Sequence, residues 1–433
     1  MRALTHLRIP TLALGVTLCL PANAADLLDI YRAAVENDPV FMAAEFQRQA
    51  AYEAVPQARA DLLPQVELGA NIARNDVNDD TLGSYQSSGF GVTVTQSIYR
   101  RSNHIALSQA EMQVEQADAD FASAKHNLLL RSAQNYFNIL AARDSLEFAR
   151  SEKNAIARQL EQAERRYEVG LIAVTDVKEA QARHDIAVAQ EIAAENQLAA
   201  AKESLRVLIG TAPPDIEPLK DDAPLDPPQP ANAEAWVGIA SSNNLSLHNA
   251  RLDVEIARKS IALQRSTRLP ALDLIGSYDD MESDGLTGDR EGGQLLVQVT
   301  VPLYTGGAIS SLVRQARANF EQAQARLDSE KRNAEQQTRD AYRNVLADIS
   351  RANALKQALL STQSGAEATQ AGFDVGTRTA VEVLTALRET FSAQADYSRA
   401  RYDFILNTLS LRQAAGTLEI ADLETVNRWL GDE

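Results

Sequence analysis

The sequence repeats itself after 206 residues, and this duplication constrains the fold more than any other feature. Residues of the same type recur at that spacing along most of the chain: Asn37 and Asn243, Tyr136 and Tyr342, Gly170 and Gly376, Leu205 and Leu411, Gly210 and Gly416. One slip occurs, because Tyr99 and its counterpart Tyr304 are 205 positions apart. Self-similarity at a fixed spacing predicts two copies of one structural unit that pack against each other.

The duplication also predicts the domain organisation. The first structural repeat spans residues 25–209 and the second spans 235–416. Between them, segment 210–234 contains seven of the 14 prolines in the chain. Because proline fixes φ and has no amide N–H, this segment is predicted to be an extended linker. Residues 417–433 follow the second repeat as a C-terminal tail.

Residues 1–24 have the pattern of a secretory signal peptide. Arg2 and Arg8 form a basic start, an apolar core follows, and the small-x-small string ANA ends at Ala24. The apolar core is too short to span a membrane as a helix. The single cysteine of the chain lies in this segment, so the mature chain is expected to have no thiol and no disulfide.

Each repeat contains two stretches in which apolar and polar residues alternate. They are 65–73 and 89–99 in the first repeat, and 271–278 and 294–304 in the second. Alternation with a period of two predicts β-strands with one apolar face. A length of about ten residues suits strands that cross an outer membrane.

Four strands are too few to close a transmembrane barrel, whose smallest known size is about eight strands. A barrel therefore requires several chains, and three chains would supply about twelve strands around an open bore. The alternative is an ordinary soluble pair of β-hairpins beside a helical bundle. The fold class that we predict is α+β, mostly α: a trimeric β-barrel continued by long helices.

Long helices are predicted after each strand pair, at about 101–168 and 308–374. Neither stretch contains proline, and both are rich in Ala, Gln, Glu and Arg, which favour helix. A helix of about 68 residues is about 100 Å long, which indicates coiled-coil-like packing. The other expected helices are at about 27–37, 39–61, 176–209, 235–242, 245–267 and 382–415.

Charge and motif content argue against several functions. The formal net charge of −17 is unfavourable for binding nucleic acid. The sequence has no H-E-x-x-H, C-x-x-C, P-loop or nucleophile-elbow motif. The histidines of the mature chain lack the spacing of metal ligands: His104, His126, His184 and His248. We therefore expect no enzyme activity, no metal and no cofactor.

The chain resembles the TolC family of outer membrane efflux and type I secretion ducts over essentially its whole mature length. The shared features are the strings VGLIAVTDV (169–177) and VGTRTAVEV (375–383), the Leu-Pro pairs at 63–64 and 269–270, and the duplication itself. The resemblance implies a homotrimer in the outer membrane of a Gram-negative bacterium, with a large periplasmic α-helical barrel. It also implies a periplasmic adaptor and an inner-membrane transporter as partners, and passive conduction of small molecules or unfolded proteins.

The resemblance also implies roles for residues at the periplasmic entrance. It places an entrance latch at Thr175, Asp176, Phe373 and Arg378, and a constriction at Glu382 and Thr385. Arg378 is expected to pair with Asp176, since such a pair can be bidentate and still break when an adaptor docks. Phe373 replaces the tyrosine of the family and has no hydroxyl to donate. The alternative for Glu382 is a carboxylate at a helix start, favoured there by the helix dipole.

Two short segments are predicted as adaptor-docking tips. They comprise Val169, Gly170, Leu171, Val375, Gly376 and Thr377. From the residues alone, the two glycines are explained by a helix reversal, because glycine is common just past the end of a helix. Thr175 or Asp176 is then expected to cap the returning helix of the first repeat.

A second class of function also fits the long helices. It is a periplasmic coiled-coil adaptor or scaffold without a membrane span. Adaptors carry one helical hairpin and β-rich flanks, whereas this sequence has two hairpins and no such flanks. The sequence identifies neither the cargo nor the transporter.

Overall fold

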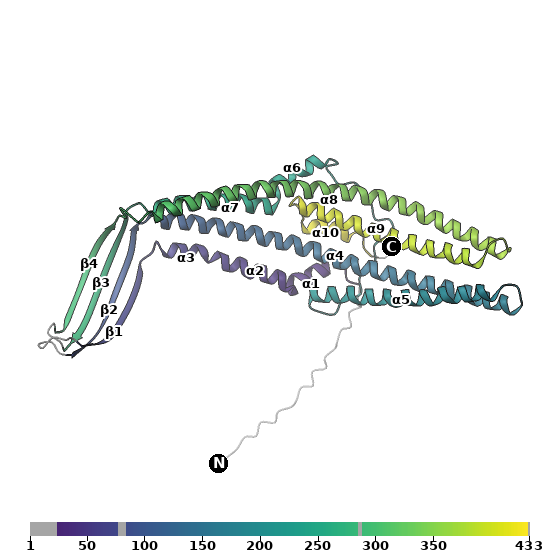
Figure 1. Cartoon of the computed structure of the whole chain (residues 1–433), viewed down its shortest axis with the longest axis horizontal. Helices are drawn as coiled ribbons and strands as arrows, with labels where there is room; N and C mark the ends of the chain where they lie inside the picture. The colour runs from purple at the N-terminus through teal and green to yellow at the C-terminus, as the bar shows by residue number, and fades with distance from the viewer. Residues whose placement is uncertain (1–23, 77–83, 285–287, 432–433) are drawn as a thin grey trace, which may run out of the picture.

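The computed structural model describes residues 24–76, 84–284 and 288–431. The molecule is elongated, with a four-stranded sheet at one end of a bundle of long helices and two helix reversals at the other end (Figure 1). The predicted signal peptide, 1–24, lies outside the described residues except for its last residue. No helix within the described ranges combines the length and the apolar character needed to cross a membrane.

Both repeats have the same order of elements, except that the helix expected at about 39–61 in the first repeat is divided into two, α2 and α3. The first repeat consists of α1 (Leu27–Asn37), α2 (Pro39–Tyr52), α3 (Ala54–Ala60), β1 (Gln65–Asp76), β2 (Ser84–Tyr99), α4 (Arg101–Glu168) and α5 (Val174–Ile209). The second consists of α6 (Ala233–Asn243), α7 (Leu245–Ser266), β3 (Ala271–Ser283), β4 (Arg290–Thr300), α8 (Ala308–Asp374) and α9 (Ala380–Ala414), and α10 (Ile420–Asn427) follows. The predicted tandem duplication is confirmed by this order.

The four long helices form two antiparallel hairpins, α4 with α5 and α8 with α9. The sequence-based bounds of α4 and α8 are confirmed to the residue. Small side chains lie where the helices of the first hairpin meet, since Ala163 of α4 and Ala180 and Ala187 of α5 are buried in one cluster. Small residues at such positions let two helices approach closely without the large side chains of a solid coiled coil.

The sheet joins the two repeats. Its strands are antiparallel in the order β1-β2-β3-β4, so β2 of the first repeat pairs with β3 of the second. All four strands extend beyond a predicted end, because β1 ends at Asp76, β2 begins at Ser84, β3 ends at Ser283 and β4 begins at Arg290. Instead of ending at residue 304 as predicted, β4 ends at Thr300. Pro302, two residues later, cannot donate a hydrogen bond to a neighbouring strand.

One face of the sheet carries exposed apolar side chains. Val66, Leu68 and Ile72 of β1 are 68%, 74% and 78% exposed. Leu295 and Val297 of β4 lie on the same face and are similarly exposed. The outer edges of β1 and β4 have no partner strand within the described part of the chain. Apolar faces and open edges of this kind require covering by lipid or by further strands.

The main core lies midway along the helices, where α1, α4, α9, α10 and the linker meet. Phe137 of α4 contacts the rings of Tyr136 and Tyr402, with both ring centroids at 5.6 Å. The linker is bound to this core and is not a free spacer, because Ile216 and Leu219 are buried and each forms a β-bridge. The C-terminal tail also packs onto the core through α10, a helix that was not predicted from the sequence.

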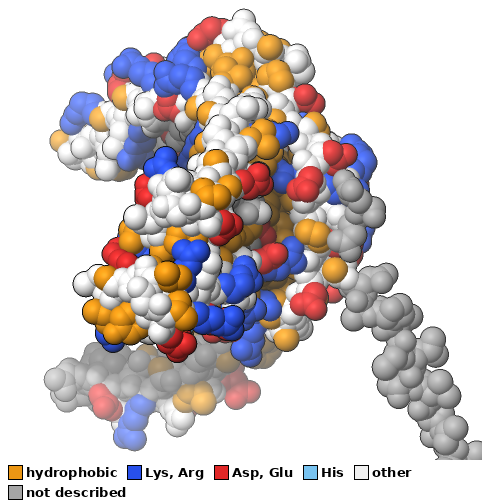
Figure 2. All heavy atoms as spheres, turned by 90° about the vertical axis from the view of Figure 1, so that its right-hand side faces the viewer, with side chains coloured by type: hydrophobic (Ala, Val, Ile, Leu, Met, Phe, Trp, Pro, Cys, Tyr) orange, Lys and Arg blue, Asp and Glu red, His pale blue; other side chains and the backbone are white. Residues whose placement is uncertain are grey.

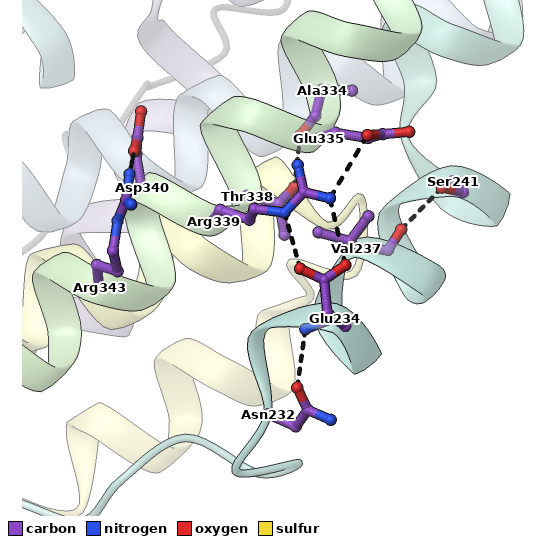
Figure 3. A network of polar contacts seen from close by, with 10 residues as sticks. All are labelled: Asn232, Glu234, Val237, Ser241, Ala334, Glu335, Thr338, Arg339, Asp340 and Arg343. Carbon is purple, nitrogen blue, oxygen red and sulfur yellow. Dashed lines mark hydrogen bonds and ion pairs between the residues drawn. The ribbon is translucent and has the colours of Figure 1, made fainter.

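Helix α6 is attached to the middle of α8 by a bidentate ion pair (Figure 3). The guanidinium of Arg339 donates to both carboxylate oxygens of Glu234, at 2.9 and 3.2 Å. The side chain of Asn232 caps the same helix by accepting from the Glu234 amide at 3.0 Å. The hydrogen bond from Arg339 lowers the pKa of the Glu234 carboxyl below its usual value. Glu234 thus connects the start of the second repeat to the long helix of that repeat.

Candidate functional site

The candidate site is the end of the molecule farthest from the sheet (Figure 1). Here α4 turns into α5 between residues 169 and 173, and α8 turns into α9 between residues 375 and 379. The interaction between α4 and α9 brings the two hairpins side by side. All the sequence-predicted site residues lie at or near this end.

Both reversals have the same backbone design. Gly170 and Gly376 adopt φ of 76° and 82°, in the left-handed region. In each turn the glycine N–H donates to the carbonyl three residues back, and the next N–H, of Leu171 or Thr377, donates to the carbonyl five residues back. These two bonds give partners to backbone carbonyl groups in the last turn of the helix. They require a residue that can adopt positive φ without a steric clash of its Cβ, and glycine has no Cβ. The glycines are thereby explained as helix ends.

The two returning helices begin differently. In α9, Thr379 and Glu382 form a capping box in which each side chain accepts from the backbone N–H of the other. In α5 the equivalent first position is Ala173, and no side-chain cap is formed. The expectation that Thr175 or Asp176 caps α5 was wrong, because both residues already lie within its first turn. The second reversal is therefore the more firmly fixed of the two.

Both carboxylate oxygens of Glu382 accept hydrogen bonds. Its Oε2 accepts from the Thr379 N–H at 2.7 Å and from the Thr379 hydroxyl at 3.0 Å, and its Oε1 accepts from Arg378 at 2.7 Å. These bonds, the backbone bond above all, lower the pKa of the Glu382 carboxyl to about 2. Within a single chain Glu382 is thus a helix-start carboxylate, the alternative weighed from the sequence. Thr385 stands one turn later and donates its hydroxyl to the carbonyl of Val381.

Arg378 does not pair with Asp176 within one chain. Its guanidinium pairs with Glu382 at 2.7 Å, and Asp176 forms no ion pair among the described residues. Glu382 is only four residues along the chain from Arg378, in the first turn of α9, so this pair needs less ordering than a pair between two hairpins. The stem of Arg378 lies against Gly372, where an added Cβ would stand 2.7 Å from the Arg378 Cγ. The latch expected from the resemblance is therefore absent from the isolated chain.

Phe373 joins the two hairpins in a way that the sequence did not indicate. It is buried, and the guanidinium of Arg166 at the end of α4 lies 4.3 Å from its ring centroid. Two turns deeper, Gln159 of α4 donates to the side-chain oxygen of Gln370 of α8 at 3.0 Å. Arg166 was missed because its only sequence signal is a basic residue near a helix end, which the helix dipole alone would explain.

The predicted docking tips project into solvent. Val169, Leu171 and Val375 are 70%, 72% and 76% exposed. Viewed from this end, apolar and basic side chains stand together at the surface (Figure 2). Thr377 differs from its counterpart Leu171, because its hydroxyl donates to the Gly372 carbonyl at 3.0 Å. Exposed apolar residues on a rigid turn suit contact with another protein.

Within the described residues, no group of three or more His, Cys, Asp or Glu side chains is arranged to hold a metal ion. The chemistry of the site is therefore that of helix ends, a cation–π contact and one local ion pair.

Comparison with known proteins decides the family. The family described as Outer membrane efflux protein matches residues 30–211 and again residues 236–417, so each repeat matches separately at the 206-residue spacing. The chain belongs to this family. It is an outer membrane protein with a large periplasmic portion and an exit duct of the efflux or type I secretion class.

Individual members of the outer membrane efflux family are similar along nearly the whole chain. Outer membrane protein TolC of Vibrio cholerae is 40% identical over 429 residues, covering 96% of both chains. Alkaline protease secretion protein AprF of Pseudomonas aeruginosa is 32% identical over 98% of this chain and 92% of its own. Among solved structures, CusC has a TM-score of 0.80 at 17% identity, covering 91% of this chain and 92% of its own, and so shares the fold.

Membership of this family decides between the two classes of function considered from the sequence. The whole-length match is to outer membrane proteins of transport, so the chain is a duct and not a soluble periplasmic adaptor. The fold class is confirmed as mostly helical with a small sheet of four strands.

Proposed function

We propose that three copies of the mature chain form one passive duct across the outer membrane. The observation that carries the proposal is the open four-stranded sheet, which has an exposed apolar face and two unpaired edges. Three such sheets would pair edge to edge into a barrel of about twelve strands, remove every open edge and turn the apolar face toward lipid. The mature chain would begin after Ala24, with repeats 25–209 and 235–416, linker 210–234 and tail 417–433.

The long charged helices then continue the duct through the periplasm. We propose that the tips formed by residues 169–171 and 375–377 contact a periplasmic adaptor that connects the duct to an inner-membrane transporter. The exposed valines and Leu171 support this assignment, because they stand on rigid turns at the far end of the helices. The transporter supplies the energy, and the duct supplies the path for small molecules or unfolded proteins.

The entrance is closed by contacts between chains in this proposal. Arg378 is more than half exposed, so it can exchange its local partner Glu382 for Asp176 of a neighbouring chain. Thr175 is exposed and lies beside the partly buried Asp176 in the first turn of α5. Phe373 holds the two hairpins of one chain together through Arg166. Three Glu382 carboxylates around the axis would favour cations, with Thr385 lining the next turn.

Conductance in a planar lipid bilayer tests the proposal. Arg378→Asp is expected to raise the conductance several-fold, because the charge reversal removes both carboxylate partners. Arg332→Asp is the matched control, since Arg332 pairs with Asp328 on the same helix and lies more than 40 residues before the reversal at the end of α8. The absence of ionic conductance from both the wild-type protein and Arg378→Asp would overturn the duct. If Arg378→Asp and the wild-type protein have equal conductance, Arg378 is not part of the latch.

Ion selectivity tests the constriction separately. Glu382→Gln is expected to reduce the preference for cations, measured as the reversal potential in a salt gradient, because it removes a ring of negative charge. A reversal potential that stays at the wild-type value would place the filter elsewhere.

A further inference from the structure

A cavity of about 500 Å³ lies where the helices meet the sheet, between the start of α4 and the last turns of α7. Four basic side chains line it, Arg101 and His104 from α4 and Lys259 and Arg265 from α7. Ser108 and Leu269 are also part of its wall. Among the residues that the structure describes, no aspartate or glutamate lines the cavity, although the chain as a whole has a net charge of −17.

The positive charge of this cavity is not neutralised by the protein. Arg101, His104 and Arg265 form no ion pair with a carboxylate among the described residues, and Lys259 donates to the hydroxyl of Ser108 at 2.8 Å. The basic neighbour Arg100, by contrast, is paired with a carboxylate at 2.8 Å. A cleft lined by one sign of charge concentrates counter-ions, so this cavity favours an anionic ligand.

The duplication repeats only part of this basic set. The position equivalent to Lys259 in the first repeat is Glu53, 206 residues earlier, and the position equivalent to Arg101 in the second repeat is Gly307, whereas Arg265 has a basic counterpart in Arg59. The cavity lies between α4 of the first repeat and α7 of the second, which contact each other. The set of four basic side chains is therefore specific to this junction between the repeats.

The position of the cavity indicates which anion is available. β2 ends at Tyr99, two residues before Arg101, and β3 begins at Ala271, two residues after Leu269. In the proposed duct these strands cross the bilayer, so the cavity stands at the depth of the lipid headgroups on the periplasmic side. Tyr99 and Leu269 are about half exposed beside it, and aromatic side chains at strand ends are typical of the membrane interface.

We propose that this cavity binds the phosphate-bearing headgroup of an anionic phospholipid in the periplasmic leaflet of the outer membrane. The inference rests on the proposed function, because it requires the sheet to lie in the membrane. Arginine guanidinium groups bind phosphate oxygens bidentately, and lysine contributes a point charge. Leu269 supplies an apolar wall for the glycerol end of the lipid. Basic pockets between helices at a membrane surface bind lipid headgroups in this way.

Lipid binding to the full-length mature protein in a neutral detergent tests the proposal. The probe is dioctanoyl phosphatidylglycerol, titrated by calorimetry. Changing Lys259→Gln together with Arg265→Gln is expected to weaken its affinity about 5- to 30-fold, because each basic residue near a membrane surface contributes roughly a factor of five. Arg59→Gln is the matched control, since Arg59 is the exposed equivalent of Arg265 in the first repeat. Its affinity should stay at the wild-type value.

Two further measurements distinguish a lipid from a free anion, and a failure of the lipid site from a failure of the proposed duct. Inorganic phosphate at the lipid concentration should not compete; equal competition would overturn the lipid assignment in favour of a free anion. Equal lipid affinity of the double variant and the wild type would overturn the site. Bilayer conductance is measured on the same preparations. If lipid binding fails while conductance persists, the inference alone fails, whereas loss of conductance in the wild type removes the proposed function as well.

Discussion

The guanidinium of Arg166 lies 4.3 Å from the ring centroid of Phe373, and this contact joins the end of α4 to the end of α8. The two residues are 207 positions apart and belong to different repeats. Phe373 is almost fully buried, so the cation lies over a ring that is partly shielded from water. The contact holds the two reversals of the entrance at a defined separation.

Arg166→Met is expected to loosen the two reversals without unfolding the chain. The change removes a cation–π contact of about 0.5–2 kcal/mol while keeping an apolar side chain of similar length over the ring. Hydrogen exchange at residues 165–175 and 372–380 should become faster. Arg165→Met is the matched control, because Arg165 pairs only with Glu161 on its own helix. If the exchange rates of Arg166→Met and Arg165→Met are equal, the contact between Arg166 and Phe373 does not stabilise the reversals.

Alanine at the two tip glycines is expected to be destabilising. Gly170→Ala and Gly376→Ala place a Cβ in the left-handed region at about 1–2 kcal/mol each. Gly416→Ala should be worse, because its Cβ would also stand 2.2 Å from the carbonyl oxygen of Asn243. Gly365→Ala, inside α8 nine residues before its end and with open space around it, should instead stabilise the protein by about 0.5–1 kcal/mol.

The midpoint of thermal unfolding in detergent measures this order. A result in which Gly365→Ala and Gly170→Ala shift the midpoint in the same direction would contradict the assignment of the tip glycine as a helix end.

The second reversal is expected to resist acid down to an unusually low pH. The pKa of the Glu382 carboxyl is lowered to about 2, so its charged form is favoured by folding. Its contribution is present above the unfolded pKa of about 4.3 and is lost as the pH falls toward 2. Protonation in the folded chain neutralises the Glu382 carboxylates, so the cation preference of the channel should be constant between pH 7 and 4 and should fall as the pH approaches 2.

Glu382→Gln provides the control for this pH dependence. The amide still accepts the backbone bond of the capping box but cannot titrate. Its cation preference, measured as the reversal potential in a salt gradient, should be independent of pH between 5 and 2. If the variant shows the same fall as the wild type, another group is responsible.

Helix α6 is expected to detach locally when Arg339 is changed. Arg339→Gln removes the bidentate bond to Glu234, and since the pair is exposed to solvent, its loss should cost little global stability. Hydrogen exchange over residues 233–243 should increase while global stability changes little. Arg343→Gln is the matched control, because Arg343 pairs with Asp340 on the same helix (Figure 3). An unchanged rate for α6 in Arg339→Gln would show that apolar packing alone holds it.

Local signals accounted for much of the fold. The bounds of α4 and α8 could be predicted to the residue, because long stretches of helix formers without proline have only one low-energy conformation. The positions of the two reversals followed from Gly170 and Gly376, since a left-handed residue at a helix end selects glycine. Because the two repeats have similar sequences, an element predicted in one repeat was also predicted at the matching position of the other.

Contacts between distant segments could not be predicted in the same way. The outer parts of the strands lack alternation, and it is the pairing of each strand with its neighbours that extends them. The family resemblance predicts that Arg378 pairs with Asp176. In the folded chain Arg378 forms its ion pair with Glu382, the carboxylate four residues later.

The sequence alone therefore determined the elements, their order and the family, because these depend on propensity, periodicity and repetition along the chain. Only the tertiary structure decided that Arg166 covers Phe373 and that four basic side chains enclose one cavity beside the sheet. Such contacts depend on how long helices are placed side by side, and a side chain at a helix surface carries no local signal of which neighbour it will meet.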